Sequence, residues 1–220
     1  MKTLLYSILF SLLPLAMAHA QVDDAYVGIQ NSHNASNAGR ATFWSADYVI
    51  TVPTGDQAGF ISLPSYRGFS VAGGGFITDQ LLVGGSIGWT GSYAEYGRRT
   101  YELEGIAGAI TGRRYDYLYA LPVLATVHYF FLPDASVEPF VGLGLGAQYT
   151  NLETQIGSLS VSDNAWDFSL NPEAGIYIPM GLGATWGFTA KVRYNQVFYK
   201  ERDFSNLQNW GFHIGVGFLY

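Results

Sequence analysis

The last eleven residues of the chain alternate large apolar side chains with small or polar ones. Side chains along a β-strand point alternately to opposite faces, so one face of this segment is apolar and the other is not. The apolar row consists of Trp210, Phe212, Ile214, Val216, Phe218 and Tyr220, and the other row of Gly211, His213, Gly215 and Gly217. Aromatic residues at both ends of an apolar row are typical of strands that cross a membrane. The pattern therefore predicts a membrane-spanning strand at 210–220.

Seven earlier segments repeat this alternation, and each ends at a turn or a polar stretch. They are 41–52, 66–77, 81–96, 115–131, 137–150, 166–178 and 184–200. The connections after the second, fourth and sixth segments are short, whereas those after the first, third, fifth and seventh are longer and more polar. Short turns at one end and long loops at the other are typical of outer-membrane barrels with periplasmic termini. The predicted fold is all-β, a closed antiparallel eight-stranded transmembrane up-and-down β-barrel.

Composition supports a membrane protein and limits its chemistry. Aromatic residues make up 16% of the chain and charged residues 13%, and there is no cysteine. Because charged residues are about a quarter of a typical soluble domain, this apolar surplus needs an apolar environment. Without cysteine the protein has neither disulfides nor thiol catalysis, so burial and hydrogen bonding must stabilise it. The net charge of −6 argues against a nucleic-acid partner, because phosphate binding rests on clustered basic residues.

The first 20 residues have the pattern of a secretory signal peptide. Lys2 precedes an apolar run at 4–15, and Ala18-His19-Ala20 matches a small-residue cleavage site. Because the run is shorter than the roughly 20 residues of a membrane-spanning helix, we expect cleavage rather than a retained anchor. Residues 21–40 are polar and rich in Asn, Ser and Ala, which predicts a flexible periplasmic lead-in. A transient extra strand at 25–29 is the alternative, and 41–220 forms the predicted barrel domain.

Three stretches of the predicted barrel resemble a known family. They are Val49-Ile50-Thr51-Val52-Pro53-Thr54-Gly55-Asp56, Ser65-Tyr66-Arg67-Gly68-Phe69 and Leu82-Val83-Gly84-Gly85-Ser86-Ile87-Gly88-Trp89. With them, residues 41–220 resemble the eight-stranded outer-membrane β-barrel family that includes the OmpX, OmpW and OmpA barrel types, in the form common in the Bacteroidetes group. Phe218 and Tyr220 resemble the terminal aromatic signal that the barrel-assembly machinery recognises, although Phe is the commoner last residue.

The resemblance implies where the protein works and what surrounds it. We expect export to the bacterial outer membrane with the help of periplasmic chaperones and the barrel-assembly machinery. The expected surroundings are outer-membrane lipids and lipopolysaccharide, and the expected state is a monomer. The resemblance implies no cofactor, and the potential metal ligands are too scattered along the sequence for a spacing argument.

Charged and histidine side chains of the predicted strands fall on the inward face. They are Asp47, Glu138, Asp167, Glu173, Lys191, Arg193, His128 and His213. If strands 166–178 and 184–200 turn around Gly181, residues whose numbers sum to about 362 face each other. Glu173 and Asn171 would then lie diagonally or directly alongside Lys191, and Ser169 near Arg193. A paired, hydrogen-bonded plug is the main interpretation, because a lone buried charge is costly. The alternative is a salt-bridge gate over a narrow water path.

The inward row of strand 137–150 is nearly bare, because Gly142, Gly144 and Gly146 occupy it. Glycine normally weakens a strand. In a small closed barrel we expect these three glycines to make room for long side chains that arrive from the opposite wall.

The predicted external loop after strand 81–96 carries two pairs of arginines. Arg98-Arg99 and Arg113-Arg114 flank Glu102 and Glu104. Guanidinium groups bind phosphate oxygens through paired hydrogen bonds. We therefore predict a contact with lipopolysaccharide headgroups, against the alternative of ordinary solvated loop charges.

Three kinds of function are compatible with the sequence. A non-enzymatic structural or surface-interaction barrel is favoured by the near-balanced interior charge and by the lack of a catalytic motif. A narrow channel for small solutes or hydrophobic molecules requires a continuous lumen, although side chains fill the interior of an eight-stranded barrel. A lipid A-modifying enzyme is the third possibility, because some small outer-membrane barrels use a His with Ser or Asp near the external rim. His213 is its weak candidate base, and we predict no catalytic residue.

Overall fold

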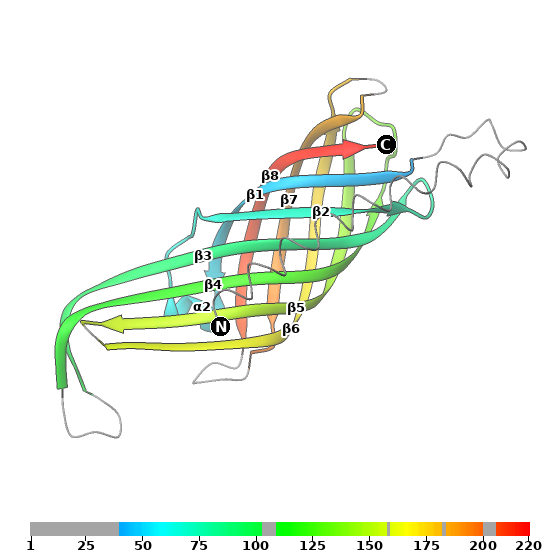
Figure 1. Ribbon diagram of the computed structural model, residues 1–220. Coiled ribbons are helices and arrows are strands. Elements are labelled where there is room, and N and C mark those ends of the chain that lie inside the picture. Colours follow the sequence, from blue (N-terminus) through cyan, green and yellow to red (C-terminus); the bar gives the residue numbers. More distant parts are fainter. Residues whose placement is uncertain (1–39, 103–108, 158, 182–183, 200–205) are drawn as a thin grey trace, which may run out of the picture. The chain divides into compact units, whose positions relative to one another are not determined.

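The structure, a computed structural model, describes residues 40–102, 109–157, 159–181, 184–199 and 206–220. Within this part, eight antiparallel strands follow one another around a closed barrel, and β8 pairs with β1 (Figure 1). The elements are β1 (Thr42–Thr54), α2 (Gly55–Phe60), β2 (Gly68–Phe76), β3 (Leu81–Glu102), β4 (Ala109–Phe130), β5 (Glu138–Ile156), β6 (Leu159–Pro179), β7 (Trp186–Val197) and β8 (Leu207–Leu219). The predicted fold class is confirmed. The predicted signal peptide and most of the lead-in lie outside the described residues.

The terminal strand closes the barrel through its last residue. Tyr220 O accepts hydrogen bonds from Ala41 N at 2.6 Å and from Thr42 N at 2.8 Å. Phe218, two residues before Tyr220, pairs with Trp44 of β1 and with Trp186 of β7. The aromatic residues of the predicted assembly signal therefore lie at the seam where the first and last strands meet.

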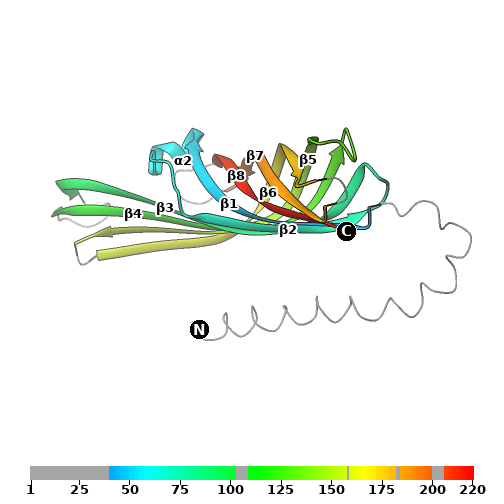
Figure 2. The same cartoon turned by 90° about the horizontal axis from the view of Figure 1, so that it is seen from above.

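Strands β3 to β6 are longer than the sequence predicts. β3 and β4 pair from Leu81 and Tyr129 out to Glu102 and Ala109, with one bulge. β5 and β6 pair from Glu138 and Tyr177 out to Ile156 and Leu159. Figures 1 and 2 show these four strands projecting beyond the other four at one side of the barrel. Much of what the sequence predicts as loop is therefore β-hairpin. These hairpins lack the alternation of apolar and polar residues, because water can reach both of their faces above the membrane.

The outward face of β4 shows where the membrane band lies. Tyr119 and Tyr129 are ten positions apart on this strand. At about 3.4 Å per residue and a tilt of about 40°, they span about 26 Å, close to the apolar band of about 25 Å of outer-membrane barrels. Val123 and Val127, which lie between them, are 44% and 45% exposed, as lipid-facing side chains are. The two tyrosines therefore mark the two aromatic girdles on β4. None of the described helices has the length and apolar character to cross a membrane.

Buried apolar side chains form two clusters inside the described barrel. The cluster at the end with the short turns, which is periplasmic in the predicted orientation, contains Phe43, Leu82, Phe130, Phe140 and Tyr177. The cluster at the opposite end contains Phe60, Ile61, Ala94, Leu118, Ala120, Leu152, Val197, Tyr199 and Leu207. We call these clusters the periplasmic plug and the external plug. In the periplasmic plug, the Phe43 ring makes edge contacts with Phe130 and Tyr177, with centroids 5.9 and 5.3 Å apart.

A short helix supplies part of the external plug. The sequence predicts only a turn after strand 41–52, but the chain forms α2 there and turns Phe60 and Ile61 into the barrel. Gln57 of α2 is also buried, and its Oε1 accepts a hydrogen bond of 3.0 Å from Asn209 Nδ2. Tyr96 Oη of β3 donates to Phe60 O at 2.9 Å. The segment after β1 therefore folds back and closes the external end.

Candidate functional site

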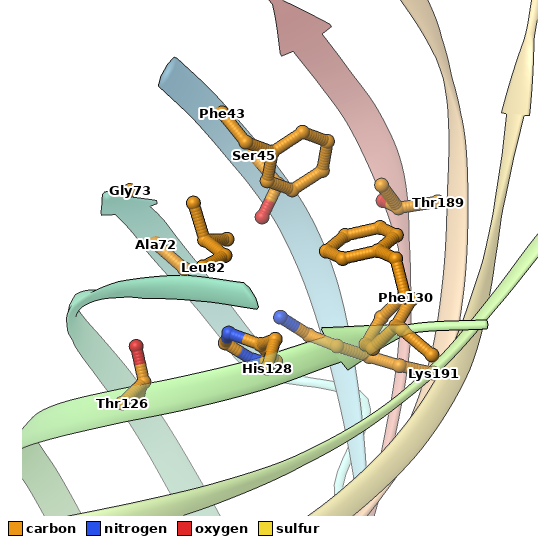
Figure 3. Close-up of a pocket in the computed structure, with 11 residues that line it drawn as sticks. Phe43, Ser45, Ala72, Gly73, Leu82, Thr126, His128, Phe130, Thr189 and Lys191 are labelled. Carbon is orange, nitrogen blue, oxygen red and sulfur yellow. The ribbon is translucent and has the colours of Figure 1, made fainter. Parts of the chain in front are cut away.

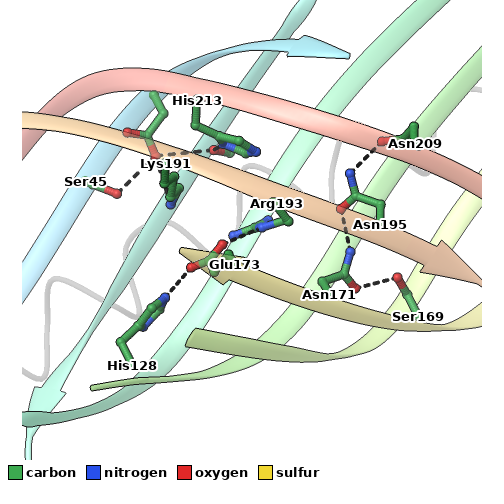
Figure 4. A network of polar contacts seen from close by, with 12 residues as sticks. Ser45, His128, Ser169, Asn171, Glu173, Lys191, Arg193, Asn195, Asn209 and His213 are labelled. Atoms are coloured by element: carbon green, nitrogen blue, oxygen red, sulfur yellow. Dashed lines mark hydrogen bonds and ion pairs between the residues drawn. The ribbon is translucent and has the colours of Figure 1, made fainter. Parts of the chain in front are cut away.

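A buried charged network lies between the two plugs (Figure 4). Its centre is Glu173 on β6, whose Oε2 accepts a hydrogen bond of 2.6 Å from Arg193 Nε on β7. The other oxygen, Oε1, contacts Nε2 of His128 on β4. All three residues are buried. Because Glu173 joins two neighbours on opposite sides, its carboxylate links three strands of the barrel wall.

One glycine makes this three-residue contact possible. In the strand register, His128 lies beside Gly142, Gly142 beside Glu173, and Glu173 beside Arg193. A Cβ at Gly142 would lie 2.4 Å from His128 Cδ2, which is closer than real Cβ atoms approach. The His128 ring therefore crosses over β5 to reach Glu173. The inward glycine makes room for the neighbouring strand, and not for the opposite wall as the sequence suggested.

Asp47 on β1 forms the second centre of the network. Its Oδ2 lies 3.2 Å from Lys191 Nζ, and its Oδ1 accepts a hydrogen bond of 2.6 Å from Thr189 Oγ1. Ser45 Oγ donates to Oδ2 at 3.2 Å and Ser70 Oγ at 3.5 Å. Each carboxylate of the network thus faces one lysine or arginine, so the charges of Asp47 and Glu173 balance those of Lys191 and Arg193.

His213, the candidate catalytic base, lies inside this network. Its Nδ1 is 3.1 Å from Ser70 Oγ on β2, and both residues are buried in the barrel wall. The described contacts of Asp47 include Ser70 but not the His213 ring. In a hydrolytic triad the acid instead orients the histidine. The contact between Ser70 and His213 is therefore that of a buried hydrogen-bond network, away from the external rim where the enzyme hypothesis requires it.

A chain of amide side chains connects the barrel wall to α2, and sequence reasoning missed it. Ser169 Oγ donates to Asn171 Oδ1 at 2.6 Å, and Asn171 Nδ2 donates to Asn195 Oδ1 at 2.5 Å. Asn195 Nδ2 donates to Asn209 Oδ1 at 2.6 Å, and Asn209 continues to Gln57. The strand alternation does place Asn171 and Asn195 inward, but only the fold brings them together.

The register between β6 and β7 differs from the predicted one. Glu173 lies opposite Arg193, and Gly175 opposite Lys191. Ser169 lies opposite Val197 and is not the neighbour of Arg193. The reason is a longer connection, in which Met180 N donates to Trp186 O at 3.1 Å, so the turn is not centred on Gly181. Lys191 therefore turns to Asp47 on β1, and Glu173 pairs with Arg193.

Two predicted members of the interior network lie apart from it. Glu138 is at the periplasmic plug, where it forms an ion pair with Arg40. The Arg40 guanidinium lies over the rings of Phe76 and Phe130, 5.6 and 5.8 Å from their centroids. Arg40 belongs to the barrel, although the sequence assigned it to the flexible lead-in. Asp167 lies opposite Gln148, and no described ion pair joins it to the network.

Two small cavities adjoin the network within the described barrel. A cavity of about 20 Å³ lies between the network and the periplasmic plug (Figure 3), lined by Phe43, Ser45, Leu82, His128, Phe130 and Lys191 among others. A second cavity of about 30 Å³ is lined by Ser70, Gln148, Arg193, Asn195, Asn209 and His213 among others. One water needs about 10 to 15 Å³ of such space. Cavities of this size have room for one or two waters, and residues of the periplasmic plug line the first of them.

The four external arginines occupy different environments. Arg113 points outward and its Nη1 donates to Glu95 Oε1 at 2.8 Å. Its pKa is raised, first by hydrogen bonding with Tyr115 and then by Glu95. Arg114, the next residue, turns inward, where its Nη2 lies 2.7 Å from Oδ2 of the buried Asp116. Successive residues of a strand face opposite sides of the sheet. Arg113 and Arg114, which the sequence predicts as a pair in an external loop, are consecutive residues of β4 and therefore face opposite sides.

Arg98 and Arg99 are exposed and lie at the bulge of β3. Arg114 instead lies over the ring of Tyr96, 5.5 Å from its centroid, and so packs on the external plug. Arg114 is therefore separated from the three exposed arginines, Arg98, Arg99 and Arg113. Among the described residues, no group of three His, Asp or Glu side chains could hold a metal ion.

Comparison with known proteins decides the family. The sequence matches the outer membrane protein beta-barrel domain family over residues 4–218. The chain belongs to this family. It is a protein of the outer membrane, as are the solved barrels that it resembles. No curated protein matches the sequence.

Two solved barrels illustrate the structural similarity. Ail, the attachment invasion locus protein of Yersinia pestis, has a TM-score of 0.52 at 15% identity, over 83% of this chain and 99% of Ail. Neisserial surface protein A (NspA) has a TM-score of 0.56 at 14% identity, over 81% of this chain and 97% of NspA. At such identities the similarity shows the fold alone.

Proposed function

We propose that this outer-membrane barrel is a non-enzymatic surface-interaction protein. Its membrane part serves as a closed anchor, and the projecting ends of β3 to β6 meet partners outside the cell. The observation that carries the proposal is the contrast between the two parts. The lumen holds a balanced charge network between two apolar plugs, whereas β3 to β6 project beyond the other four strands. A channel or an enzyme would need an open lumen or a reactive group at the rim.

The projecting sheet has two outer edges that can accept a further strand. The pairing of β2 with β3 ends at Gly68 and Thr90. The pairing of β7 with β6 ends at Ser169 and Val197, followed by one hydrogen bond from Phe198 N to Phe168 O. Beyond these points, no described strand covers the outer edge of β3 or β6. Free backbone N–H and C=O groups at such edges bind extended peptides as an added strand.

The two edges differ in how open they are. β3 has a bulge between Tyr96 and Arg99 and carries two exposed arginines there, features that hinder strand addition. On β6, residues 159–162 are exposed on both faces. The nearest charge on β6 itself, Asp163, accepts a hydrogen bond of 3.0 Å from Tyr199 Oη. We therefore assign the docking edge to β6, with an extended segment of a partner protein as its occupant.

The proposal can be tested by removing one backbone donor from the β6 edge. Phe168 O accepts its hydrogen bond from Phe198 N, on the side of β6 that forms the outer edge. The N–H and C=O groups of one residue point to the same side of a strand, and the side alternates along the strand. The N–H groups of the even-numbered residues of β6 therefore face the outer edge. Ser162→Pro removes such a donor and keeps the pairing with β5, and Ser162→Ala keeps the donor. Attachment of bacteria that display each variant to immobilised extracellular proteins is the measurement. We expect Ser162→Pro to lose most attachment and Ser162→Ala to retain it. Equal attachment of both variants would contradict the proposal.

A further inference from the structure

A ladder of outward-facing aromatic rings climbs from the membrane band onto the projecting sheet. Its rings are Trp89, Tyr119, Tyr117, Tyr93 and Tyr115, in order of contact. Consecutive centroids are 6.2, 6.3, 5.2 and 6.3 Å apart, and the interplanar angles range from 8° to 45°. We call this set the tyrosine ladder. Its residues occupy odd positions of β3 and β4, the same rows that face lipid lower on these strands.

The upper part of the tyrosine ladder lies above the hydrocarbon. Tyr119 marks the external girdle of β4, and Tyr117 and Tyr115 follow two and four residues further out. With the same rise and tilt, they stand about 5 and 10 Å above the girdle. A side chain that faces sideways at this height meets the headgroup layer of the outer leaflet. In a Gram-negative outer membrane this layer contains the sugars of lipopolysaccharide.

The chemistry of the ladder suits a saccharide. A tyrosine ring offers a flat apolar face, on which the C–H face of a sugar ring can stack, and a hydroxyl that stays in water. Glu95 and Arg113 stand at the top of the ladder, where Tyr93 Oη donates to Glu95 Oε2 at 3.3 Å. The Glu95 and Arg113 side chains are 41% and 63% exposed, so both can also bind sugar hydroxyls.

We infer that the tyrosine ladder binds the saccharide part of lipopolysaccharide in the surrounding outer leaflet. The ladder is continuous with the lipid-facing surface of β3 and β4, so its neighbour is a lipid of the same leaflet. This contact uses tyrosines and Arg113, and not the four arginines that the sequence suggested. It is separate from the docking edge of β6, because it lies on the outward face of β3 and β4.

The test compares lipopolysaccharide that carries core sugars with lipid A, which has the acyl chains and phosphates but lacks the core. Binding of each to the detergent-solubilised barrel is measured by native mass spectrometry. We expect the wild type to bind lipopolysaccharide about tenfold more tightly than lipid A, a factor that corresponds to one stacked contact or two. The triple variant Tyr93→Ser, Tyr115→Ser, Tyr117→Ser should lose this preference and keep its affinity for lipid A.

Matched variants separate this contact from other causes. Tyr129→Ser changes a tyrosine of the same outward row of β4 at the periplasmic girdle and should keep the preference. Ser162→Pro on β6 should keep it too, so failure of the docking proposal is distinguishable from failure of this one. If the triple variant does not fold, Tyr115→Ser at the end of the ladder replaces it. Equal binding of both lipids by the wild type would overturn the inference. A second result would also overturn the inference. If Arg113→Gln abolishes the preference for lipopolysaccharide over lipid A and the tyrosine variants keep it, the contact is to phosphate.

Discussion

Arg193 on β7 lies directly opposite Glu173 on β6, and its Nε donates a hydrogen bond of 2.6 Å to Glu173 Oε2. The two side chains are only 4% and 1% exposed. Inside the barrel each of these charges depends on the other, because bulk water does not reach either side chain. Removing one partner of a buried pair typically costs about 3 to 5 kcal/mol, whereas replacing both by apolar residues can be nearly neutral.

The pair should therefore show strong coupling in stability. We expect Glu173→Leu to lower the free energy of unfolding by about 3 to 5 kcal/mol, because Arg193 stays buried without its partner. Adding Arg193→Met should recover part of this loss. Urea unfolding of the barrel in lipid vesicles measures both effects. If the loss of unfolding free energy in the double variant equals the sum of the losses in Glu173→Leu alone and Arg193→Met alone, the two charges are not a coupled pair.

Gly142 should be intolerant of even one methyl group. Gly142→Ala places a Cβ 2.4 Å from His128 Cδ2 and pushes the ring away from Glu173. We expect a loss of about 1 to 3 kcal/mol, as for other overpacked cores. Gly75→Ala on β2 is the matched control, because its Cβ would meet nothing closer than 3.8 Å. Equal unfolding midpoints for the two variants would show that His128 does not need the space over Gly142.

The periplasmic plug should depend on Arg40. Arg40→Ala leaves Glu138 buried without its ion pair and uncovers the rings of Phe76 and Phe130, so we expect a loss of about 3 to 5 kcal/mol. Asp134→Asn removes the charge of the other carboxylate near Arg40, which is 88% exposed and 3.5 Å away, and keeps a side chain that tolerates the positive φ of this residue. An exposed ion pair contributes at most about 1 kcal/mol. Thermal unfolding, followed by the loss of the fast-migrating form on unboiled gels, measures both. A small effect of Arg40→Ala would place Arg40 in the lead-in after all.

Much of the fold follows from a period of two in the sequence. Alternation alone placed Asp47, Glu173, Lys191 and Arg193 on the inward face, where the structure has them. The alternation is informative in the membrane-spanning part of the strands, because lipid requires an apolar residue at every second, outward-facing position. The two projecting hairpins have no such requirement, since water can solvate both faces, so the sequence predicts loops there.

The partners of the inward residues could not be predicted from the same pattern. Which cation faces Glu173 depends on the register of β6 and β7, and hence on the geometry of one turn. α2 has six residues, too few for a recognisable helical period. Arg114 differs from Arg113 only by one strand position, yet it lies inside because the strand continues there. These features depend on where elements end, which the sequence marks least clearly.

The transmembrane placement should make the outward face of β8 intolerant of charge. Ile214 is 61% exposed and lies opposite Tyr48 and Ala190 in the middle of the barrel wall. Arginine at the midplane of an outer-membrane barrel costs about 2 to 4 kcal/mol, so we expect Ile214→Arg to lose this amount in vesicles. Leu159→Arg, at the tip of β6, should change stability little. Equal losses at both positions would contradict the assigned membrane band.

The central claim is that the lumen is closed by the two plugs and the network between them. The most direct test is the single-channel conductance of the refolded chain in a planar bilayer, over a range of salt concentration and voltage. A gel-shift control on the same sample verifies that the protein is folded. The closed barrel predicts no discrete current steps from verified folded protein. Reproducible steps that scale with salt concentration would contradict it, and would make the pairs of Glu173 and Asp47 a gate.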